Sequence, residues 1–580
     1  MSKKKKKERH VSNDLLFPIM LILCVMPFVV RLAIYDCGYG DFDWYSSNGE
    51  IEDLYQYFRC YFFEIVAVFT SIVLAFYMFL NKEKIRGFRM LWPLGIYGVM
   101  VIVSTLMSVN LGASLQGNYY QFQPMLVLLG YLVIFFYTYQ VLEKETDYRT
   151  IWRGIVVVAL LMFFVGGFQI FKKDLLDFAF MQRLVMSEEL YSIYGGTMET
   201  IFSGNNVYLS LFNPNYASAF LCMMAAVTGV MSYSEQDKKR RGLYLVLFIG
   251  ILVLMWFTYS RGSIVSFAAA ILVFLLVIPK SKGKFLKYFI PGMIAVVAVL
   301  VVIDGCNNFK YLNRWVEKPV EQNITSLVTD DQGISLCYYG EDYLVKIDGE
   351  TPVVYDGKGK QMPLTETEDD YVLETEHPFS MFVSTGEDAE LLYMSIDGLM
   401  FTFTKSEEGY GFRTRNEKIT TMRDVEKVDF HGWEYLGSGR VYIWSRTLPL
   451  LEKHLLAGSG PDTFAEVYPQ DDYLGKAYYA KSTTAIMERP HNDFLLQWVQ
   501  VGGLACISLV VFYIFLLIRG GKYFAHCPLD TMKDRLGCGC YFACLCYMVE
   551  SFFNDSTLFT TPMFWIFAGI TLAASYENKH

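Results

Sequence analysis

The sequence predicts an all-α polytopic membrane protein of about twelve transmembrane helices with a small extracytoplasmic β-rich insert. Three observations predict this class. Of the 580 residues, 53% are hydrophobic and only 19% are charged, whereas a soluble protein carries about 25% charged residues. Apolar runs long enough to cross a bilayer recur along the chain, and one long interruption carries short alternating runs that are typical of β-strands.

The apolar runs are close to the roughly 20 residues that a membrane-spanning helix needs. The basic residues 1–14 precede the first run, which lacks a small-residue cleavage site, so we expect an uncleaved first span and a cytoplasmic N-terminus. The expected spans are 15–34, 59–80, 90–107, 122–142, 151–171, 215–232, 243–259, 262–279, 285–303, 494–518, 536–553 and 558–576.

The loop charges support this order of spans. Loops on the side of the basic N-terminus are mostly rich in Lys and Arg, whereas the first loop on the other side is acidic and the second is uncharged. Because basic loops stay in the cytoplasm, helices 1–9 are expected over 15–303 and helices 10–12 over 494–576. Residues 304–493 then form an extracytoplasmic segment, and the C-terminus is cytoplasmic. We therefore expect a multi-pass protein of the cell membrane.

The extracytoplasmic segment divides into two parts. Residues 320–430 contain short alternating runs separated by Asp-Gly, Asp-Gly-Lys-Gly and Glu-Gly, which predicts hairpins in a small acidic β insert. Residues 440–490 instead begin with apolar residues at spacings of three and four, which predicts helix.

Three polar clusters are expected on the extracytoplasmic side. Arg261 ends the seventh span within "TYSRGS", Arg440 opens "RVYIW", and His491 lies just before the tenth span, followed by Asn492. Each has a structural alternative: a snorkelling cation, an interfacial amphipathic helix and a structural histidine. Together they offer two permanent guanidinium cations, which bind phosphate oxygens, and one imidazole that can exchange a proton. Such a set suits a lipid diphosphate.

Other chemistries find little support in the sequence. There is no P-loop, dinucleotide fingerprint or nucleic-acid-binding module, so we expect no nucleic acid partner. The twelve cysteines show no CxxC…CxxC spacing, and no carboxylate cluster indicates a required metal. We therefore expect no cofactor and no metal ligands. Whether Cys306 and Cys337 form a disulfide stays open.

At these residues the chain resembles the O-antigen ligase and O-antigen polymerase family of bacterial membrane glycosyltransferases. The matching pieces are "TYSRGS", "RVYIW" followed by "LAGSGPDTF", "HNDFLLQWVQVGG" and "LFNPNYASAFL". In one departure, Gln500 stands where the family often has Glu. The resemblance implies an architecture like that of the C-type glycosyltransferases, with transfer of a glycan from undecaprenyl diphosphate to an acceptor hydroxyl. It implies inversion without a metal.

The resemblance also implies roles for individual residues. Arg261 and Arg440 would bind the diphosphate, with His491 at the acceptor or leaving group. The substrate-binding candidates come from three of the matching motifs and are Asn492, Asn213, Asn215, Gly458 and Gly460. For Asn213 and Asn215, helix capping is the alternative, and the glycines permit a tight turn. The implied partners are the undecaprenyl-diphosphate-linked glycan donor, membrane lipid, and a glycan, lipid or wall-polymer acceptor.

Alternatives within and beyond this family stay open. The motifs do not separate a polymerase from a ligase in cell-envelope polysaccharide biosynthesis. A transporter or lipid flippase would more often carry charged residues in mid-span or broken helices in paired halves. A membrane scaffold or sensor with an outer ligand-binding domain gives no reason for the Arg261 and His491 clusters. The β insert could select an acceptor, bind a partner or shield the site.

Overall fold

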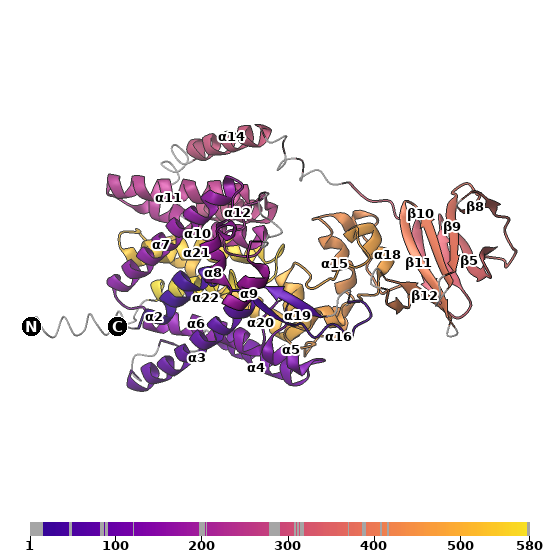
Figure 1. The fold of residues 1–580 in the computed structure, drawn as a ribbon. Helices are drawn as coiled ribbons and strands as arrows, with labels where there is room; N and C mark the ends of the chain where they lie inside the picture. The colour runs from indigo at the N-terminus through magenta and orange to yellow at the C-terminus, as the bar shows by residue number, and fades with distance from the viewer. Residues whose placement is uncertain are drawn as a thin grey trace, which may run out of the picture.

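A helical body lies at one end of the molecule and a β-rich insert at the other, joined by short helices (Figure 1). The computed structural model describes residues 15–576 apart from 46–48, 82–85, 88–90, 120, 197–203, 205, 278–289, 307–308, 310–312, 314–317, 369, 386–389, 407–408 and 415–416. The expected basic terminus 1–14 and the start of the span expected at 285–303 lie outside the described residues.

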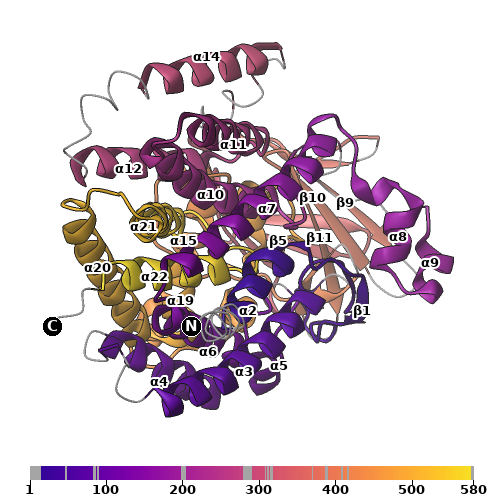
Figure 2. The ribbon, with the colours of Figure 1, turned by 90° about the vertical axis from the view of Figure 1, so that its left-hand side faces the viewer.

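The body consists of apolar helices packed around α21. This helix contacts α7, α10, α12, α20 and α22, and Figure 2 shows it surrounded by neighbouring helices. The helices of the body are α2 Phe17–Met20, α3 Tyr57–Leu80, α4 Trp92–Leu106, α5 Leu111–Gln116, α6 Met125–Val141, α7 Glu145–Ile170, α8 Ala179–Val185, α9 Glu188–Tyr194, α10 Pro214–Ser234, α11 Lys238–Phe257, α12 Arg261–Val277, α14 Ile290–Cys306, α20 Gly503–Phe524, α21 Met532–Glu550 and α22 Thr561–Ala574.

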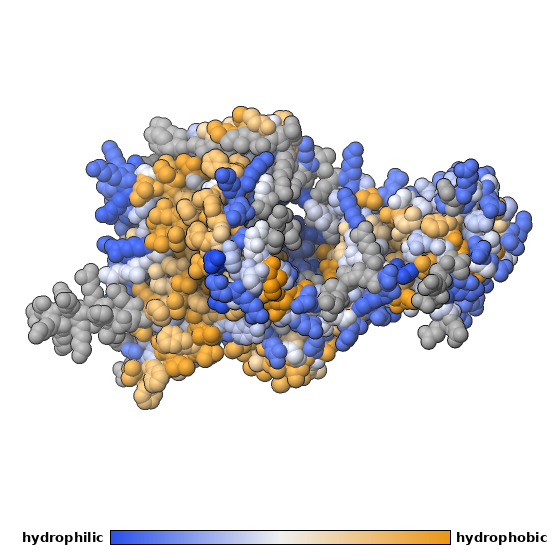
Figure 3. All heavy atoms as spheres, viewed as in Figure 1, coloured by the Kyte–Doolittle hydropathy of each residue, from blue (hydrophilic) through white to orange (hydrophobic). Residues whose placement is uncertain are grey.

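Several of these helices could span a membrane. Among the described residues, α3, α7, α10, α11 and α20 are long and apolar enough to do so, and α4, α6, α12 and α22 are shorter apolar helices. Large apolar side chains cover the outside of the body, among them Ile65, Phe76 and Phe79 on α3, and Figure 3 shows this apolar surface beside a more polar insert. Such a surface fits lipid. The count of twelve spans and the sides of the loops stay predictions.

Two expected spans are interrupted. The run 15–34 is helical only through Phe28, passing through a π-helical turn η1 (Leu21–Val25) and a 3-10 turn η2 (Met26–Phe28). Pro27 explains this change, because proline lacks an N–H and its ring crowds the preceding turn. The chain then becomes strand β1 (Ala33–Asp36), which pairs with β2 (Glu50–Asp53).

The second interruption is at Gly502, between α19 (Asp493–Val501) and α20. Gly502 has φ +108°, and an added Cβ would collide with the carbonyl oxygen of Leu456. A left-handed residue without a side chain ends a helix in this way. The expected tenth span therefore begins as a separate short helix.

The insert is built from two antiparallel sheets in which strands pair with their neighbours in the chain. One sheet has the order β3-β4-β5-β6 and the other β13-β12-β11-β10-β9-β8-β7, and they share an apolar core. Asp397 and Gly398 both have positive φ in the β10–β11 turn, as a type I′ hairpin requires. The strands are β3 Ile324–Thr329, β4 Ile334–Tyr338, β5 Glu341–Asp348, β6 Thr351–Asp356, β7 Thr365–Glu366, β8 Tyr371–Leu373, β9 Phe379–Thr385, β10 Glu390–Ile396, β11 Leu399–Ser406, β12 Gly409–Arg413 and β13 Ile419–Thr420.

Short helices connect the insert to the body. They are η9 Trp433–Tyr435, α15 Arg440–Thr447, α16 Leu450–Lys453, α17 Phe464–Val467, α18 Tyr473–Gly475, the π-helical η10 Lys476–Ala480, and α19. The backbone N–H of Ser459 donates to the carbonyl of Val499 at 2.8 Å, which fixes this connecting segment against α19. The connection holds the expected helical stretch 440–490 over the body.

Candidate functional site

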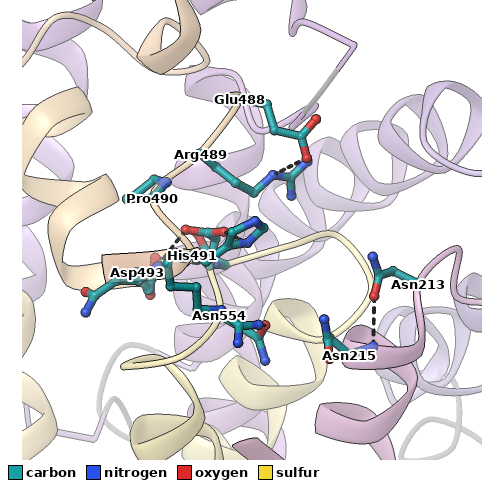
Figure 4. A network of polar contacts seen from close by, with 12 residues as sticks. Asn213, Asn215, Glu488, Arg489, Pro490, His491, Asp493 and Asn554 are labelled. Atoms are coloured by element: carbon teal, nitrogen blue, oxygen red, sulfur yellow. Dashed lines mark hydrogen bonds and ion pairs between the residues drawn. The ribbon is translucent and has the colours of Figure 1, made fainter. Parts of the chain in front are cut away.

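His491 lies in a loop that rests on the turn between α21 and α22. The backbone N–H of Asp493 donates to the carbonyl of Ser551 at 2.8 Å, and the N–H of Asn492 donates to Asp555 Oδ1 at 3.0 Å. His491 Nδ1 lies 3.3 Å from Asp555 Oδ2, in the network drawn in Figure 4. The carboxylate is fully buried, whereas the imidazole is 33% exposed. A buried carboxylate thus holds a histidine that can still be reached.

The backbone of His491 is unusual. Its φ is +52°, in the left-handed region that residues other than glycine seldom occupy. Backbone conformations of this kind occur often at functional sites, where surrounding contacts hold them in place. Here the contacts of Asn492 and Asp493 with the α21–α22 turn hold the loop, so the imidazole has a defined direction.

Arg440 opens α15 beside this loop. Its Nη2 donates to Asn554 Oδ1 and its Nη1 to the carbonyl of Gly437, both at 3.4 Å, and no described group accepts a hydrogen bond from its Nε. Burial lowers the pKa of Arg440, against the pull of nearby carboxylates, and the neighbouring Arg261 cation lowers it further. One buried donor of the guanidinium therefore has no hydrogen-bond acceptor among the described residues.

Arg261 is at the start of α12 and reaches the same region. Its Nη2 donates to Ser438 Oγ at 3.1 Å, two residues before Arg440. Behind it, Glu550 accepts from Ser266 Oγ at 2.8 Å and so joins α21 to α12. A Cβ added at Gly262 would lie 3.0 Å from Glu550 Oε1. Gly262 thus permits this close approach of Glu550.

Arg489 adds a third guanidinium group. It is 2% exposed, its Nε lies 3.2 Å from Glu488 Oε1, and its Nη1 donates to Tyr216 OH at 2.7 Å. The ring of Tyr216 stacks on Phe559, with centroids 5.4 Å apart. Arg489 therefore links the 488–493 loop to α10 and to the α21–α22 turn.

A cavity of about 340 Å³ lies beside His491 and Arg489, within the size range of small-molecule sites. We call it the site cavity. With Nδ1 facing Asp555, the His491 Nε2 atom can accept a proton, and the buried carboxylate stabilises the imidazolium that forms. Arg489 brings a guanidinium group to the cavity, where it is paired with Glu488. The lining of the site cavity includes Ser438, Tyr442, Lys481, Glu488, Arg489 and His491.

Two of the asparagines singled out in the sequence cap helices. Asn492 Oδ1 accepts from the N–H of Leu495 at 3.1 Å at the start of α19, while its Nδ2 donates to Phe552 O at 3.2 Å. Asn213 Oδ1 accepts from the backbone of Asn215 at 2.8 Å at the start of α10. Figure 4 shows Asn213 and Asn215 to one side of His491. Side-chain capping is thus the role observed for Asn492 and Asn213.

The glycines singled out in the sequence lie against backbone and serine side chains instead of in the cavity. A Cβ at Gly458 would collide with the carbonyl of Gln500, and one at Gly460 (φ +111°) would collide with Ser108 Oγ. They allow residues 456–464 to pack on α19 and on the end of α4. Gln500, in the family's Glu position, is buried against Gln121, its amide 2.9 Å away. Gly458, Gly460 and Gln500 therefore contribute to packing and do not line the site cavity.

Sequence reasoning missed Asp555, Arg489 and Tyr216. Arg489 stands two residues before His491, and Tyr216 follows the Asn-Pro-Asn motif, so their neighbours marked both positions. Asp555 occurs in the polar run "NDST" (554–557) between the last two apolar runs. By the predicted topology this run lies on the same side as His491. A polar run between two spans was the signal available for Asp555.

No group of three His, Cys, Asp or Glu side chains that could hold a metal ion occurs within the described part of the chain. The chain matches no model of a known protein family, no curated protein and no solved structure.

Proposed function

We propose that the chain is a membrane glycosyltransferase, similar to O-antigen ligases and polymerases. It would transfer a glycan from an undecaprenyl-diphosphate carrier to an acceptor hydroxyl at the outer face of the cell membrane. Apolar helices that fit a bilayer lie close to the polar cavity. A lipid-linked substrate needs both surroundings, since its chain stays in the hydrocarbon and its diphosphate stays at headgroup level.

One observation carries the proposal. His491, paired with Asp555, lines the site cavity together with Ser438. Arg261 donates to Ser438, and Arg440 follows Ser438 by two residues at the start of α15. A histidine oriented by a buried carboxylate is suited to accept a proton, and guanidinium groups stabilise the charge of a departing phosphate. A binding protein for an anion would need the arginines but not the oriented histidine.

The reaction assigns a task to each group. The acceptor hydroxyl oxygen attacks the anomeric carbon of the donor glycan and forms the new glycosidic bond. The bond between that carbon and the diphosphate oxygen breaks, and its electron pair leaves with the carrier diphosphate. The hydroxyl proton passes to His491 Nε2, and the guanidinium groups of Arg261 and Arg440 offset the charge gained by the diphosphate. Attack opposite the leaving group gives inversion.

An apolar groove offers support for the lipid part of the donor. Its volume is about 670 Å³, and its lining includes Phe58, Arg31 and Tyr55. Tyr55 lies 5.8 Å from Phe212, which stacks on Tyr216 at 6.4 Å, the residue that Arg489 binds. Aromatic contacts thus connect the apolar groove with Arg489 at the site cavity. A polyprenyl chain bound in the groove would direct its diphosphate toward the arginines.

The direct test is turnover by the purified full chain in liposomes. The donor is the lipid-diphosphate-linked repeat unit isolated from the cells that produce the protein, and the measured products are free carrier diphosphate and the glycan pattern on a gel. A ladder without added acceptor would identify a polymerase. One larger product that requires an added acceptor would identify a ligase.

Matched variants make this test specific. His491→Ala and Arg261→Ala should abolish release of the carrier diphosphate. His431→Ala removes the exposed histidine that lies 3.2 Å from Asp429, and Arg413→Ala removes an arginine of the insert paired with Glu417; both should retain turnover. Full turnover by His491→Ala, or no turnover by the parent protein with any acceptor, would contradict the proposal and favour a transporter or scaffold.

A further inference from the structure

A second cavity, larger than the site cavity, lies where three segments meet. Its volume is about 930 Å³, at the upper end of the range for ligand sites. Its walls come from the β1–β2 loop near Trp44, from the edge of the insert near Tyr410, and from the connecting helices near Arg446. We call it the junction cavity. Neither the proposed transfer reaction nor any motif of the sequence assigns it a role.

Aromatic rings and polar groups share its walls. Phe42 and Trp44 lie in contact, with ring centroids 4.9 Å apart and planes inclined by 33°, and Trp44 is only partly buried. Exposed Asp43 stands between them. An aromatic face next to hydrogen-bonding groups is suited to a ligand that has both apolar C–H faces and hydroxyl groups.

The cations of the junction cavity are paired with carboxylates. Lys453 Nζ lies 3.1 Å from Glu426 Oε2, and Arg423 pairs with Asp471. Arg446 pairs with a buried carboxylate behind the wall, Asp472. Three cations and five carboxylates line the cavity, so its walls present many donors and acceptors with an excess of negative charge. That pattern favours a neutral, hydroxyl-rich ligand over a phosphate.

Hydrogen bonds hold the walls together. Lys418 Nζ donates to the carbonyl oxygens of Gly40 at 2.7 Å and Phe42 at 3.0 Å. The end of the insert therefore fixes the β1–β2 loop, and with it the aromatic wall. Arg446 contacts Asp472 at 2.7 Å through its Nε on the opposite side. A site held in this way needs little rearrangement to bind a ligand.

Helix α15 separates the junction cavity from the site cavity. Tyr442 lines the site cavity and Arg446 lines the junction cavity, with the guanidinium 4.5 Å above the Tyr442 ring. Tyr442 and Arg446 are about 6 Å apart along the helix, at 1.5 Å per residue. An extended molecule could therefore occupy both cavities.

We propose that the junction cavity binds the non-reacting sugars of the acceptor, a neutral oligosaccharide, and thereby presents its terminal hydroxyl to His491. This inference rests on the proposed transferase function for the direction of the acceptor. Sugar binding at the junction cavity can be measured without measuring turnover. The β insert then contributes an acceptor subsite instead of serving only as a cover.

The test uses the oligosaccharide released by mild acid from the lipid carrier of the producing cells. Its binding to the purified full chain in detergent is measured by saturation-transfer NMR with titration. Trp44→Ala should weaken binding about tenfold through loss of the aromatic face, and Asp43→Asn by several fold. Trp92→Ala, which removes a half-exposed tryptophan at the start of α4 outside both cavities, should bind as the parent does.

Turnover distinguishes this inference from the transferase proposal. Trp44→Ala should raise the KM for the oligosaccharide acceptor with little change in kcat, whereas His491→Ala should bind the oligosaccharide and lose turnover. Unchanged binding by folded Trp44→Ala and Asp43→Asn would overturn the subsite even if His491→Ala is inactive. If Trp44→Ala does not fold, Asp43→Asn decides, since Asp43 is exposed.

Discussion

The helical body and the described part of the β insert differ in whether they bury charged side chains. The body and its connecting loops bury Arg59, Arg489, Asp493, Glu550 and Asp555, each at most 5% exposed. In the described part of the insert, the buried polar side chains are two threonines, with no charged group among them. Burying a charge costs several kcal/mol unless it is paired. The insert has an ordinary apolar core, whereas the body and its connecting loops bury charged side chains.

This difference indicates where function resides. The proposed chemistry would account for the charges near His491, because stability alone would favour apolar replacements there. Arg59 shows that not every buried charge is catalytic. Its Nη2 donates to the carbonyl of Ser210 at 2.9 Å, and its guanidinium covers the Phe559 ring at 4.4 Å. Such a residue supports the architecture behind the site.

The largest effect is expected from Asp555→Asn. This variant tests whether the buried carboxylate beside His491 contributes to turnover. An amide can still accept from the backbone of Asn492 but cannot stabilise the His491 imidazolium. Turnover should fall about 10³-fold, measured as release of carrier diphosphate. Asp429→Asn alters the exposed pair with His431 and should leave the rate unchanged. Equal rates for parent and Asp555→Asn would remove the distinction between the two pairs.

Arg440→Lys should have the next largest effect. Lysine keeps the charge but loses the planar set of donors that can hold two phosphate oxygens. A loss of about 10²-fold in kcat is expected, the size seen on removing a donor to developing charge. The matched replacement Arg413→Lys in the insert should have no effect on kcat. A fully active Arg440→Lys protein would show that only charge is needed at α15.

Phe403→Ala tests whether the insert has a separate stability. Phe403 is fully buried in the shared core of the two sheets, so its truncation should destabilise the insert by about 3–5 kcal/mol. Hydrogen exchange measured by mass spectrometry should rise in β9–β12 while protection in α10 and α21 is retained. Equal loss of protection in both regions would mean that body and insert unfold as one unit.

Lys476→Met should give the smallest effect, a gain of a few degrees in Tm. Lys476 is fully buried between insert and body, and no described group accepts a hydrogen bond from its Nζ. Burial lowers its pKa from 10.5 to about 7. The unfolded chain therefore binds a proton more readily between these values, and parent stability falls as pH drops from about 10.5 toward 7.

The methionine variant lacks that proton uptake. Its advantage over the parent should thus be full below pH 7 and should shrink as pH rises toward 10.5. Melting at pH 6 and pH 9 measures this, with Lys358→Met, an exposed lysine of the insert, as the control. An advantage that grows with pH would reverse the assigned pKa direction.

Local patterns predicted the elements better than their partners. Apolar runs predicted helices such as α7, and Asp397-Gly398 predicted the β10–β11 hairpin, because each depends on nearby residues. Pro27 could have warned of the break in the first span. The pairing of His491 with Asp555 depends on how α21 and α22 pack, which no periodicity encodes. The role of Gly458 was likewise hidden, since the backbone it contacts lies beyond its local sequence.

The neighbour-to-neighbour pairing of the insert strands has a consequence for biosynthesis. Contacts between adjacent strands close short loops, which form quickly, so the strands can pair as soon as residues 324–420 have emerged. The site is different. Arg489 meets Tyr216 across 273 positions, and Asn492 meets Asp555 across 63. A nascent chain would therefore carry paired insert strands well before the candidate site was complete, because that site needs the final helices.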